Sequence, residues 1–263
     1  GNLHCLIADM KVLESHLDAS FVRTNVEPAF EKEKPKFIVM DGNASSSGQI
    51  EMCKLASKFN IPLFFDPTST LKCIRPFKHQ DNSLNFAVIK PNHFELVALA
   101  EHFGLSIDPS LITFSSNHHS TILDSAIQKK HLKPLSDLGF QLLNHCKNIK
   151  VLLLSLGKMG MLYLSLYFGP QEPCSLLSHQ PYKVTKQSSF FSHFSVVDVL
   201  PIKSVVGAGD NFVAGFIHRA TSKPSSSIFS AIKWGMATST ICLESEHAIN
   251  PLLSNTYVEY VLK

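Results

Sequence analysis

Short, continuous apolar runs alternate along the chain with segments in which apolar residues recur at helical spacing. Because the runs are unbroken by polar residues, we expect strands that are covered on both faces. These strands are Cys5–Asp9, Phe37–Asp41, Leu63–Asp66, Phe86–Lys90, Val151–Ser155 and Met161–Ser165. The helices between them are Gly48–Asn60, Asn92–Phe103 and Leu135–Cys146. This alternation predicts an α/β fold, a doubly wound and mostly parallel sheet flanked by helices.

Two stretches interrupt this rhythm. Leu105–Ser120 is rich in Ser, His and Pro, and Phe168–Ser195 is long, polar and aromatic. Loops of this length are uncommon in compact domains unless they are functional or disordered, so we expect the second stretch to be a mobile insertion. No linker of domain scale and no internal repeat separates the rest, which predicts a single domain over residues 1–263.

Polar residues follow five of the predicted strands. The groups are Asp9, Asp41-Gly42-Asn43, Asp66-Pro67-Thr68, Lys90-Pro91-Asn92 and Ser155-Leu156-Gly157. Any one of them could be a capped turn. In doubly wound sheets, however, ligands bind beyond the carboxyl ends of the strands, so five such groups together favour a binding crevice.

The composition excludes several classes of protein. Hydrophobic residues make up 44% of the 263 residues, charged residues 17%, and the formal net charge is +3. No run of Lys and Arg forms a track for nucleic acid, and no apolar run approaches the roughly 20 residues of a membrane helix. The six cysteines lie far apart without a C-x-x-C pair, which predicts reduced thiols in a cytoplasmic protein.

The chemistry is most concentrated in Val206–Phe216 (VGAGDNFVAGF). Gly207 and Gly209 permit a tight turn, and a helix is predicted to start at once. The free N–H groups and the positive dipole end of such a helix form an anion site. Asp210 would lie in the first turn, where a carboxylate beside these N–H groups suits phosphoryl transfer.

Other interpretations of the glycine motif are weaker. Asp210 could simply cap the helix. A dinucleotide-binding G-x-G-x-x-G fingerprint fails because residue 212 is Phe and the motif lies late in the chain. A Walker A motif is absent from the sequence, and Lys158 does not have the surroundings of a Walker lysine.

These residues resemble the signature of the ribokinase-like, or PfkB, sugar and nucleoside kinases. Other segments match that family in the same order: Lys90–Leu96 (KPNHFEL), Ser155–Gly160 (SLGKMG) and Ala248–Pro251 (AINP), the last resembling the segment near the adenine pocket. Within the family, Asp41-Gly42-Asn43 and Phe65–Lys72 (FDPTSTLK) look most like the pseudouridine kinases.

The resemblance implies a role for each matching residue. Asp210 would be the general base, with anion-hole amides from Gly207, Ala208 and Gly209. Asn92 and Glu95 would organise Mg²⁺, although N-x-x-E is equally a near capping box and both roles are compatible. The nucleotide would be ATP, bound by Ser155, Gly157, Gly160 and Asn250, and a tight turn between two strands is the alternative for Ser155–Gly160. Asp41 and Asn43 would contact the substrate, and a monovalent cation such as K⁺ is compatible with the family.

The chain departs from the family pattern at its start. Nothing matches the glycine-glycine substrate motif or the small β-sheet lid, so we expect that the N-terminal portion and lid are missing, or that a partner or second copy in a homodimer supplies the lid. Three functions stay open. The chain is an ATP-dependent pseudouridine kinase, or half of one; a related ribose, fructose or adenosine kinase; or an inactive nucleotide-binding remnant of a kinase.

Overall fold

The computed structural model describes residues 11–78, 85–111, 125–178, 189–194 and 202–262, and residues 125–131 in backbone only. The described chain divides into two compact units. The sheet unit comprises Asp9–Gly169 and Leu177–Ser195, and the helical unit comprises Gly1–Ala8, Pro170–Leu176 and Val196–Lys263, each over its described residues. The prediction of a single domain over residues 1–263 stays a prediction.

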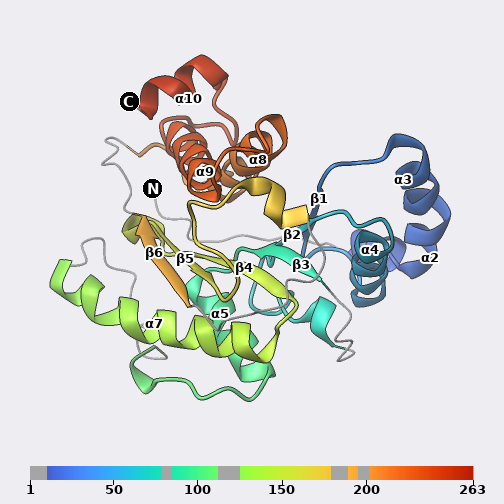
Figure 1. The fold of residues 1–263 in the computed structure, drawn as a ribbon, viewed down its shortest axis with the longest axis horizontal. Coiled ribbons are helices and arrows are strands. Elements are labelled where there is room, and N and C mark those ends of the chain that lie inside the picture. Colours follow the sequence, from blue (N-terminus) through green and yellow to red (C-terminus); the bar gives the residue numbers. More distant parts are fainter. Residues whose placement is uncertain (1–10, 79–84, 112–124, 179–188, 195–201, 263) are drawn as a thin grey trace. The chain divides into compact units, whose positions relative to one another are not determined.

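Six strands form one sheet in the order β1-β2-β3-β4-β5-β6 (Figure 1). Their bounds are β1 Ile38–Asp41, β2 Leu63–Asp66, β3 Phe86–Ile89, β4 Ile149–Ser155, β5 Met161–Ser165 and β6 Phe190–Phe194. The first four strands are parallel, while β5 and β6 each run antiparallel to the preceding strand. The predicted mostly parallel α/β sheet flanked by helices is therefore confirmed. Among these six strands, the spatial order in the sheet is the same as the order along the chain. The predicted strand Cys5–Asp9 lies outside the described residues.

The helices of the sheet unit either precede β1 or connect successive strands. They are α1 Lys11–His16, α2 Ala19–Phe21, the π-helix η1 Val22–Val26, α3 Glu27–Glu33, α4 Ser46–Lys58, the 3₁₀ helices η2 Arg75–Phe77 and η3 Gly157–Met159, α5 His93–His102 and α7 Ser125–His145. Ser45 caps α4 through its hydroxyl, and Gly104 follows α5 with φ +64°, a left-handed conformation that favours glycine. Helix α7 starts well before the predicted Leu135 because Pro134 is accommodated inside it.

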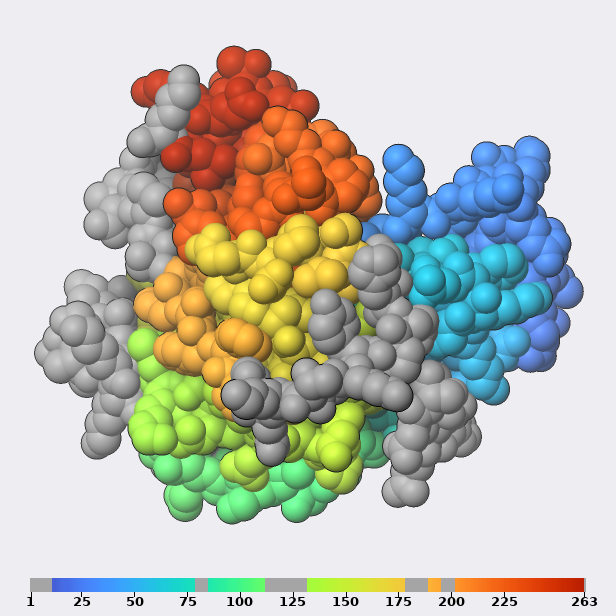
Figure 2. All heavy atoms as spheres, in the orientation of Figure 1, coloured from blue at the N-terminus to red at the C-terminus, as the bar shows by residue number. Residues whose placement is uncertain are grey.

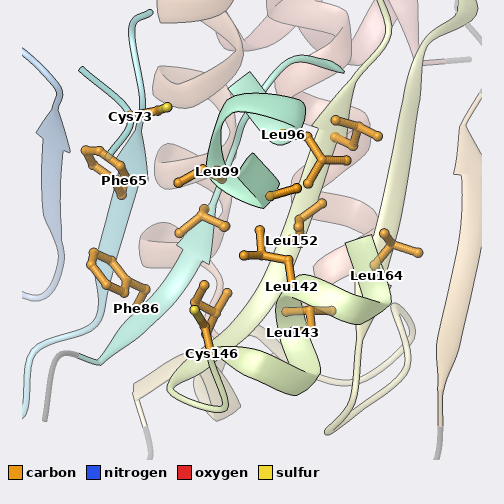
Figure 3. Close-up of a cluster of buried hydrophobic side chains, with 14 of the residues drawn as sticks. Phe65, Cys73, Phe86, Leu96, Leu99, Leu142, Leu143, Cys146, Leu152 and Leu164 are labelled. Carbon is orange, nitrogen blue, oxygen red and sulfur yellow. The ribbon is translucent and has the colours of Figure 1, made fainter. Parts of the chain in front are cut away.

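The central strands of the sheet are buried, and leucines from α5 and α7 pack against them. The prediction of strands covered on both faces is wrong for β1, where Val39 is 51% exposed. All residues of β3 and β5 are buried, as are all but the last of β4. Leu96 and Leu99 of α5 and Leu142 of α7 lie close to Leu152 of β4 (Figure 3). Burial of such side chains is the main stabilising contribution to this unit, at roughly 1.5–3 kcal/mol for each fully buried side chain.

Part of the predicted insertion is regular structure. Phe190–Phe194 is strand β6 and pairs with β5 along its whole length, from Met161 opposite Phe194 to Ser165 opposite Phe190. The prediction of a mobile loop is therefore wrong for this segment. The sequence did not reveal this strand, because only Phe194 is buried and the other four residues are half-buried or exposed. The 3₁₀ helix η4 Cys174–Ser178 is also regular, and residues 179–188 lie outside the described part of the chain.

Three helices build most of the described helical unit: α8 Ala208–Ser222, α9 Ile228–Leu243 and α10 Asn255–Val261. They form one continuous block of orange and red in the space-filling view (Figure 2). Gly215 of α8 lets α8 and α9 approach each other closely, because a Cβ atom at position 215 would lie 2.3 Å from Thr238 Oγ1 on α9. Trp234, Ala237 and Ile241 of α9 pack around Val258 of α10.

The cysteines that the structure describes are free thiols, as predicted. Cys53, Cys73, Cys146, Cys174 and Cys242 are all buried. Burial raises the pKa of Cys73 and of Cys146 to about 12. No described helix has the length and hydropathy needed to cross a membrane.

Candidate active site

Polar residues gather at the carboxyl ends of β1 to β4, as the sequence predicted. Asp41 ends β1 directly opposite Asp66 at the end of β2. One strand pair further on, Asn92 and Ser155 form a parallel bridge beyond β3 and β4. Because all four strands are parallel, these groups share one edge of the sheet. The sequence prediction that strand ends create a polar edge is confirmed for these four strands, and Asp9 lies outside the described residues.

A buried ion pair lies at the centre of this edge. Lys90 Nζ is 3.0 Å from Asp66 Oδ2, and the side chains are 7% and 21% exposed. The two residues are held by their strands, since the Lys90 N–H also donates to the Phe65 carbonyl at 2.9 Å. Lys90 therefore places a positive charge within the polar edge, next to Asp66.

Asn92 and Glu95 form a complete capping box at the start of α5. The Asn92 side chain accepts from the Glu95 N–H, and Glu95 Oε2 accepts from the Asn92 N–H, each at 2.9 Å. Glu95 is only 4% exposed. Burial raises the pKa of the Glu95 carboxyl, partly offset by the Asn92 N–H and Lys90, while Asp66 adds to the rise. The helix-capping interpretation is thus confirmed, and the metal role of both residues stays a prediction.

Asp41 and Asn43 lie together in the turn after β1. Asp41 is exposed, and its two carboxylate oxygens accept from the Asn43 N–H at 2.9 Å and from Asn43 Nδ2 at 2.6 Å. Lys72 Nζ donates to Asn43 Oδ1 at 2.7 Å. Asn43 therefore connects the Asp41 carboxylate to the Lys72 ammonium.

Arg75 holds the backbone of the same turn through its carbonyl oxygens. Its Nη1 lies 2.9–3.2 Å from the carbonyl oxygens of Gly42, Asn43 and Ala44, and its Nη2 pairs with Glu14 at 2.5 Å. A planar guanidinium suits such convergent acceptors. The turn that carries Asp41 and Asn43 is consequently rigid in its backbone.

Ser155, Gly157 and Gly160 form the turn between β4 and β5. Gly157 and Gly160 have φ values of +58° and +87°, in the region that favours glycine. The Leu156 N–H donates to the Gly160 carbonyl at 2.8 Å, and the Ser155 N–H donates to the Pro91 carbonyl at 2.9 Å. The tight-turn interpretation is confirmed, and a nucleotide role for these three residues stays a prediction.

Gly207, Ala208, Gly209 and Asp210 begin α8 in the helical unit. Gly207 is the N-cap with φ +82°, and it contributes no side-chain hydrogen bond to the first turn. By contrast, a Ser or Asn side chain caps α4, α5, α9 and α10. Gly209 and Asp210 are exposed. The first turn of α8 thus presents amide groups and one carboxylate, as the sequence predicted.

The side chain of Asn250 is engaged within the helical unit. Its Nδ2 donates to the Ile241 carbonyl at 2.8 Å, and its Oδ1 accepts from the Leu252 N–H at 3.0 Å. The residue is 7% exposed. Asn250 therefore fixes the backbone after Ala248, and its predicted contact with a nucleotide stays a prediction.

Sequence reasoning did not assign a role to four residues that organise these turns: Lys72, Arg75, Lys90 and Asn211. A signal was present for Lys90, because a lysine that ends a buried strand needs a partner. Arg75 and Asn211 act on backbone carbonyls, and no spacing in the sequence reveals such contacts.

Solved structures similar to this chain include kinases. A carbohydrate kinase from Agrobacterium tumefaciens is 17% identical over the whole chain, with a TM-score of 0.59 and 64% of that protein covered. The ribokinase from Arabidopsis thaliana, solved with ribose and ATP, is 16% identical, with a TM-score of 0.55, and 87% of this chain covers 56% of it. The chain thus spans less than two thirds of the length of these proteins.

Sequence comparison agrees with the fold. A pseudouridine kinase from Arabidopsis thaliana is 24% identical over 275 aligned residues, covering 95% of this chain and 67% of that protein. Residues 18–255 match the pfkB family carbohydrate kinase. The chain therefore belongs to the pfkB family of carbohydrate kinases, as the glycine motif and the ordered segments predicted.

Proposed function

We propose that this protein is an ATP-dependent phosphotransferase that acts on a primary hydroxyl of a nucleoside or sugar, with pseudouridine as the best-supported substrate. Family membership supports the phosphotransfer reaction. The Asp41-Gly42-Asn43 and Phe65–Lys72 segments, together with the similarity to a pseudouridine kinase, support the nucleoside. The ribokinase solved with ATP supports the nucleotide.

The observation that carries the proposal is the exposed first turn of α8. Asp210 stands at its third position, after two glycines and an alanine whose amides have no side-chain cap. In the proposed reaction Asp210 accepts the proton of the attacking hydroxyl. The amides of Gly207, Ala208 and Gly209 bind the transferred phosphoryl group, whose negative charge the helix dipole stabilises.

Residues of the sheet unit have proposed roles of their own. Ser155, Gly157 and Gly160 are proposed to contact ATP. Asp41 is proposed to accept hydrogen bonds from substrate hydroxyls, and Asn43 to donate hydrogen bonds to them or accept from them. The rigid backbone behind Asp41 supports this role, because a fixed carboxylate loses little conformational freedom when it binds a ligand.

Asn92 and Glu95 fit a magnesium ion that keeps most of its waters. Mg²⁺ prefers oxygen ligands and is usually held by one or two carboxylates together with substrate phosphates. Glu95 supplies such a carboxylate, although Oε2 also accepts from the Asn92 N–H. The described residues contain no cluster of three or more His, Cys, Asp or Glu side chains that could hold a metal. When bound, Mg²⁺ would neutralise phosphate charge.

The decisive experiment changes the proposed base. We expect Asp210→Asn to lower kcat by about 10²–10⁴-fold, the usual contribution of a general base, while the Kd for ATP changes little. Asp137→Asn, on the exposed surface of α7, serves as the control with normal turnover. Unchanged turnover in Asp210→Asn would remove Asp210 from the mechanism.

Substrate identity is tested by measuring ATP consumption with pseudouridine, uridine, ribose and adenosine. Pseudouridine is expected to give the highest kcat/KM. A larger value with ribose or adenosine would identify a related sugar or adenosine kinase. A wild-type chain that shows a thermal shift with millimolar ATP and Mg²⁺ but consumes no ATP with any of the four acceptors would identify an inactive nucleotide-binding remnant.

A further inference from the structure

Asn211, the residue after the proposed base, connects two separate segments of the helical unit. Its Nδ2 donates to the carbonyl oxygens of Gly207 and Ala248, each at 2.8 Å. A primary amide has two N–H donors, so both acceptors can be satisfied at once. Both partners are carbonyl oxygens, which only accept, so the nitrogen must be the atom that faces them. We call this arrangement the Asn211 bridge.

The Ala248 carbonyl is also contacted from two other sides. Cys242 Sγ lies 3.2 Å from it and 3.4 Å from the Val206 carbonyl. Gly207 approaches so closely that a Cβ atom there would lie 2.3 Å from the Ala248 oxygen. Residue 248 is therefore fixed directly against the glycine turn that begins α8.

Asn211 is itself held in place. Its backbone N–H donates to the Gly207 carbonyl at 2.9 Å, and its own carbonyl accepts from Thr238 Oγ1 on α9 at 2.7 Å. The residue is 5% exposed. Because the Asn211 side-chain amide is buried and its backbone is fixed on both sides, it holds the Ala248 carbonyl at a fixed distance from α8.

The segment after Ala248 is tied to α9 a second time. Asn250 bonds to the Ile241 carbonyl and closes a turn onto Leu252. With Ala248 fixed by the Asn211 bridge and Asn250 fixed by α9, the backbone between them has little freedom. The glycine turn and the Ala248–Asn250 segment are thus held as one rigid surface.

We infer that Asn211 is a positioning residue for the nucleotide. By setting the spacing between the anion-binding turn Gly207–Asp210 and the Ala248–Asn250 segment, which resembles the family's segment near the adenine pocket, it lets the two bind the phosphate and base ends of one nucleotide together. This inference rests on the proposed function. It predicts that loss of the Asn211 bridge weakens ligands that span both segments and spares ligands that occupy the phosphate end alone.

The test compares ATP with inorganic tripolyphosphate, which has no base. In the full chain, we expect Asn211→Ala to raise the Kd and KM for ATP by about tenfold, because the two segments are no longer pre-organised at one spacing, and to leave the Kd for tripolyphosphate within about twofold. Asn211→Asp should weaken ATP further, because a carboxylate would face two carbonyl oxygens. The KM for the phosphate acceptor should not change.

Asn144→Ala is the matched control. Asn144 Nδ2 donates to the Phe140 carbonyl one helical turn earlier at 2.9 Å, the same local bond as Asn211 to Gly207, but on the exposed face of α7. It should leave both dissociation constants unchanged. If an Asn211 variant does not fold, Cys242→Ala provides a second route, because it removes another donor to the Ala248 carbonyl; it should raise the Kd for ATP alone.

The outcomes separate this inference from the proposed function. Wild-type chain that binds neither ATP nor tripolyphosphate overturns both. Wild-type chain that binds ATP, with Asn211→Ala binding it equally well, overturns the inference alone. Equal weakening of ATP and tripolyphosphate also overturns it, because such a loss reflects general disruption of the turn.

Discussion

Lys90 and Asp66, from the ends of neighbouring strands, form a buried ion pair with 3.0 Å between Nζ and Oδ2. Removing Lys90 leaves the Asp66 carboxylate, which is 21% exposed, without this partner, so we expect Lys90→Met to lower the free energy of unfolding by about 1–2 kcal/mol, between the costs for exposed and for fully buried pairs. Lys133→Met breaks the exposed pair with Asp137 and should cost less than about 0.5 kcal/mol. Urea denaturation measures both, and adding Asp66→Asn to Lys90→Met should restore part of the loss. Equal losses in the two single variants would contradict the assignment.

Glu95 is a buried carboxylate whose pKa is raised by burial, so its charged form is the unfavourable one. The variant Glu95→Gln keeps an oxygen to accept from the Asn92 N–H and removes the charge. Above the pKa of folded Glu95, its melting temperature should equal or exceed that of the wild type. The difference should shrink as the pH falls below that pKa, because the folded wild-type carboxyl becomes neutral, and should vanish only below the unfolded value of 4.5.

The same variant tests the metal role. If Glu95 organises Mg²⁺, the Mg²⁺ concentration for half-maximal activity should rise by about tenfold or more in Glu95→Gln. Glu101→Gln, on the exposed side of α5, should change neither the melting temperature nor the Mg²⁺ requirement. A Mg²⁺ requirement unaffected by Glu95→Gln would leave this residue as a helix cap only.

Alanine substitutions at Gly207 and Gly104 distinguish the cost of backbone strain from the cost of a close atomic contact. Both have positive φ, but a Cβ atom at Gly207 would lie 2.3 Å from the Ala248 oxygen, whereas one at Gly104 has nothing within 4 Å. Gly104→Ala should therefore cost about 1 kcal/mol of unfolding free energy, from strain alone. Gly207→Ala should cost about 2 kcal/mol more, since Ala248 must move. Similar losses in chemical denaturation would show that the contact is easily relieved.

Burial of Lys150 should make the stability of the protein depend on pH in the alkaline range. It is buried, donates to the Leu177 carbonyl at 2.9 Å, and burial lowers its pKa to about 8 from an unfolded value of 10.5. Below about pH 8 the full cost of burying the ammonium is present. Between about 8 and 10.5 the unfolded chain binds more protons, so stability rises with pH.

The comparison is with Lys150→Met, which cannot titrate. From pH 7 to pH 9.5, the wild type should gain roughly 1–3 kcal/mol of unfolding free energy relative to this variant. Lys147→Met, at an exposed position close by in sequence, should follow the wild type at every pH. A constant difference between wild type and Lys150→Met across this range would show that the ammonium is not penalised by burial.

The pattern of apolar residues predicted strands β1 to β5 almost residue by residue. Unbroken runs such as Leu63–Asp66 and Met161–Ser165 match β2 and β5, because a strand covered on both faces has no polar positions to confuse its limits. The helices before β1 and strand β6 were not predicted. Lys11–Glu33 mixes charged and apolar residues in four short helical elements. Strand β6 has few buried positions and pairs with β5.

The sequence predicted those parts of the site in which the residue type itself indicates the chemical role. Asp210 and the glycines follow from the motif, and the polar strand ends follow from topology. The contacts of Arg75 with three carbonyls and of Asn211 with two are different, because their partners are backbone atoms that every sequence contains. Such contacts arise from the folded geometry, and the sequence carries no trace of them.

The buried thiols of the described chain have a practical consequence for labelling. Only a thiolate reacts rapidly with maleimides or iodoacetamide, and Cys73 and Cys146, with pKa values of about 12, are almost wholly protonated at neutral pH. Native cysteines at these positions should stay silent until the chain unfolds. A cysteine introduced at an exposed site, such as Glu259 on α10, could then carry a fluorophore that reports nucleotide binding, while delayed modification of the native thiols times unfolding.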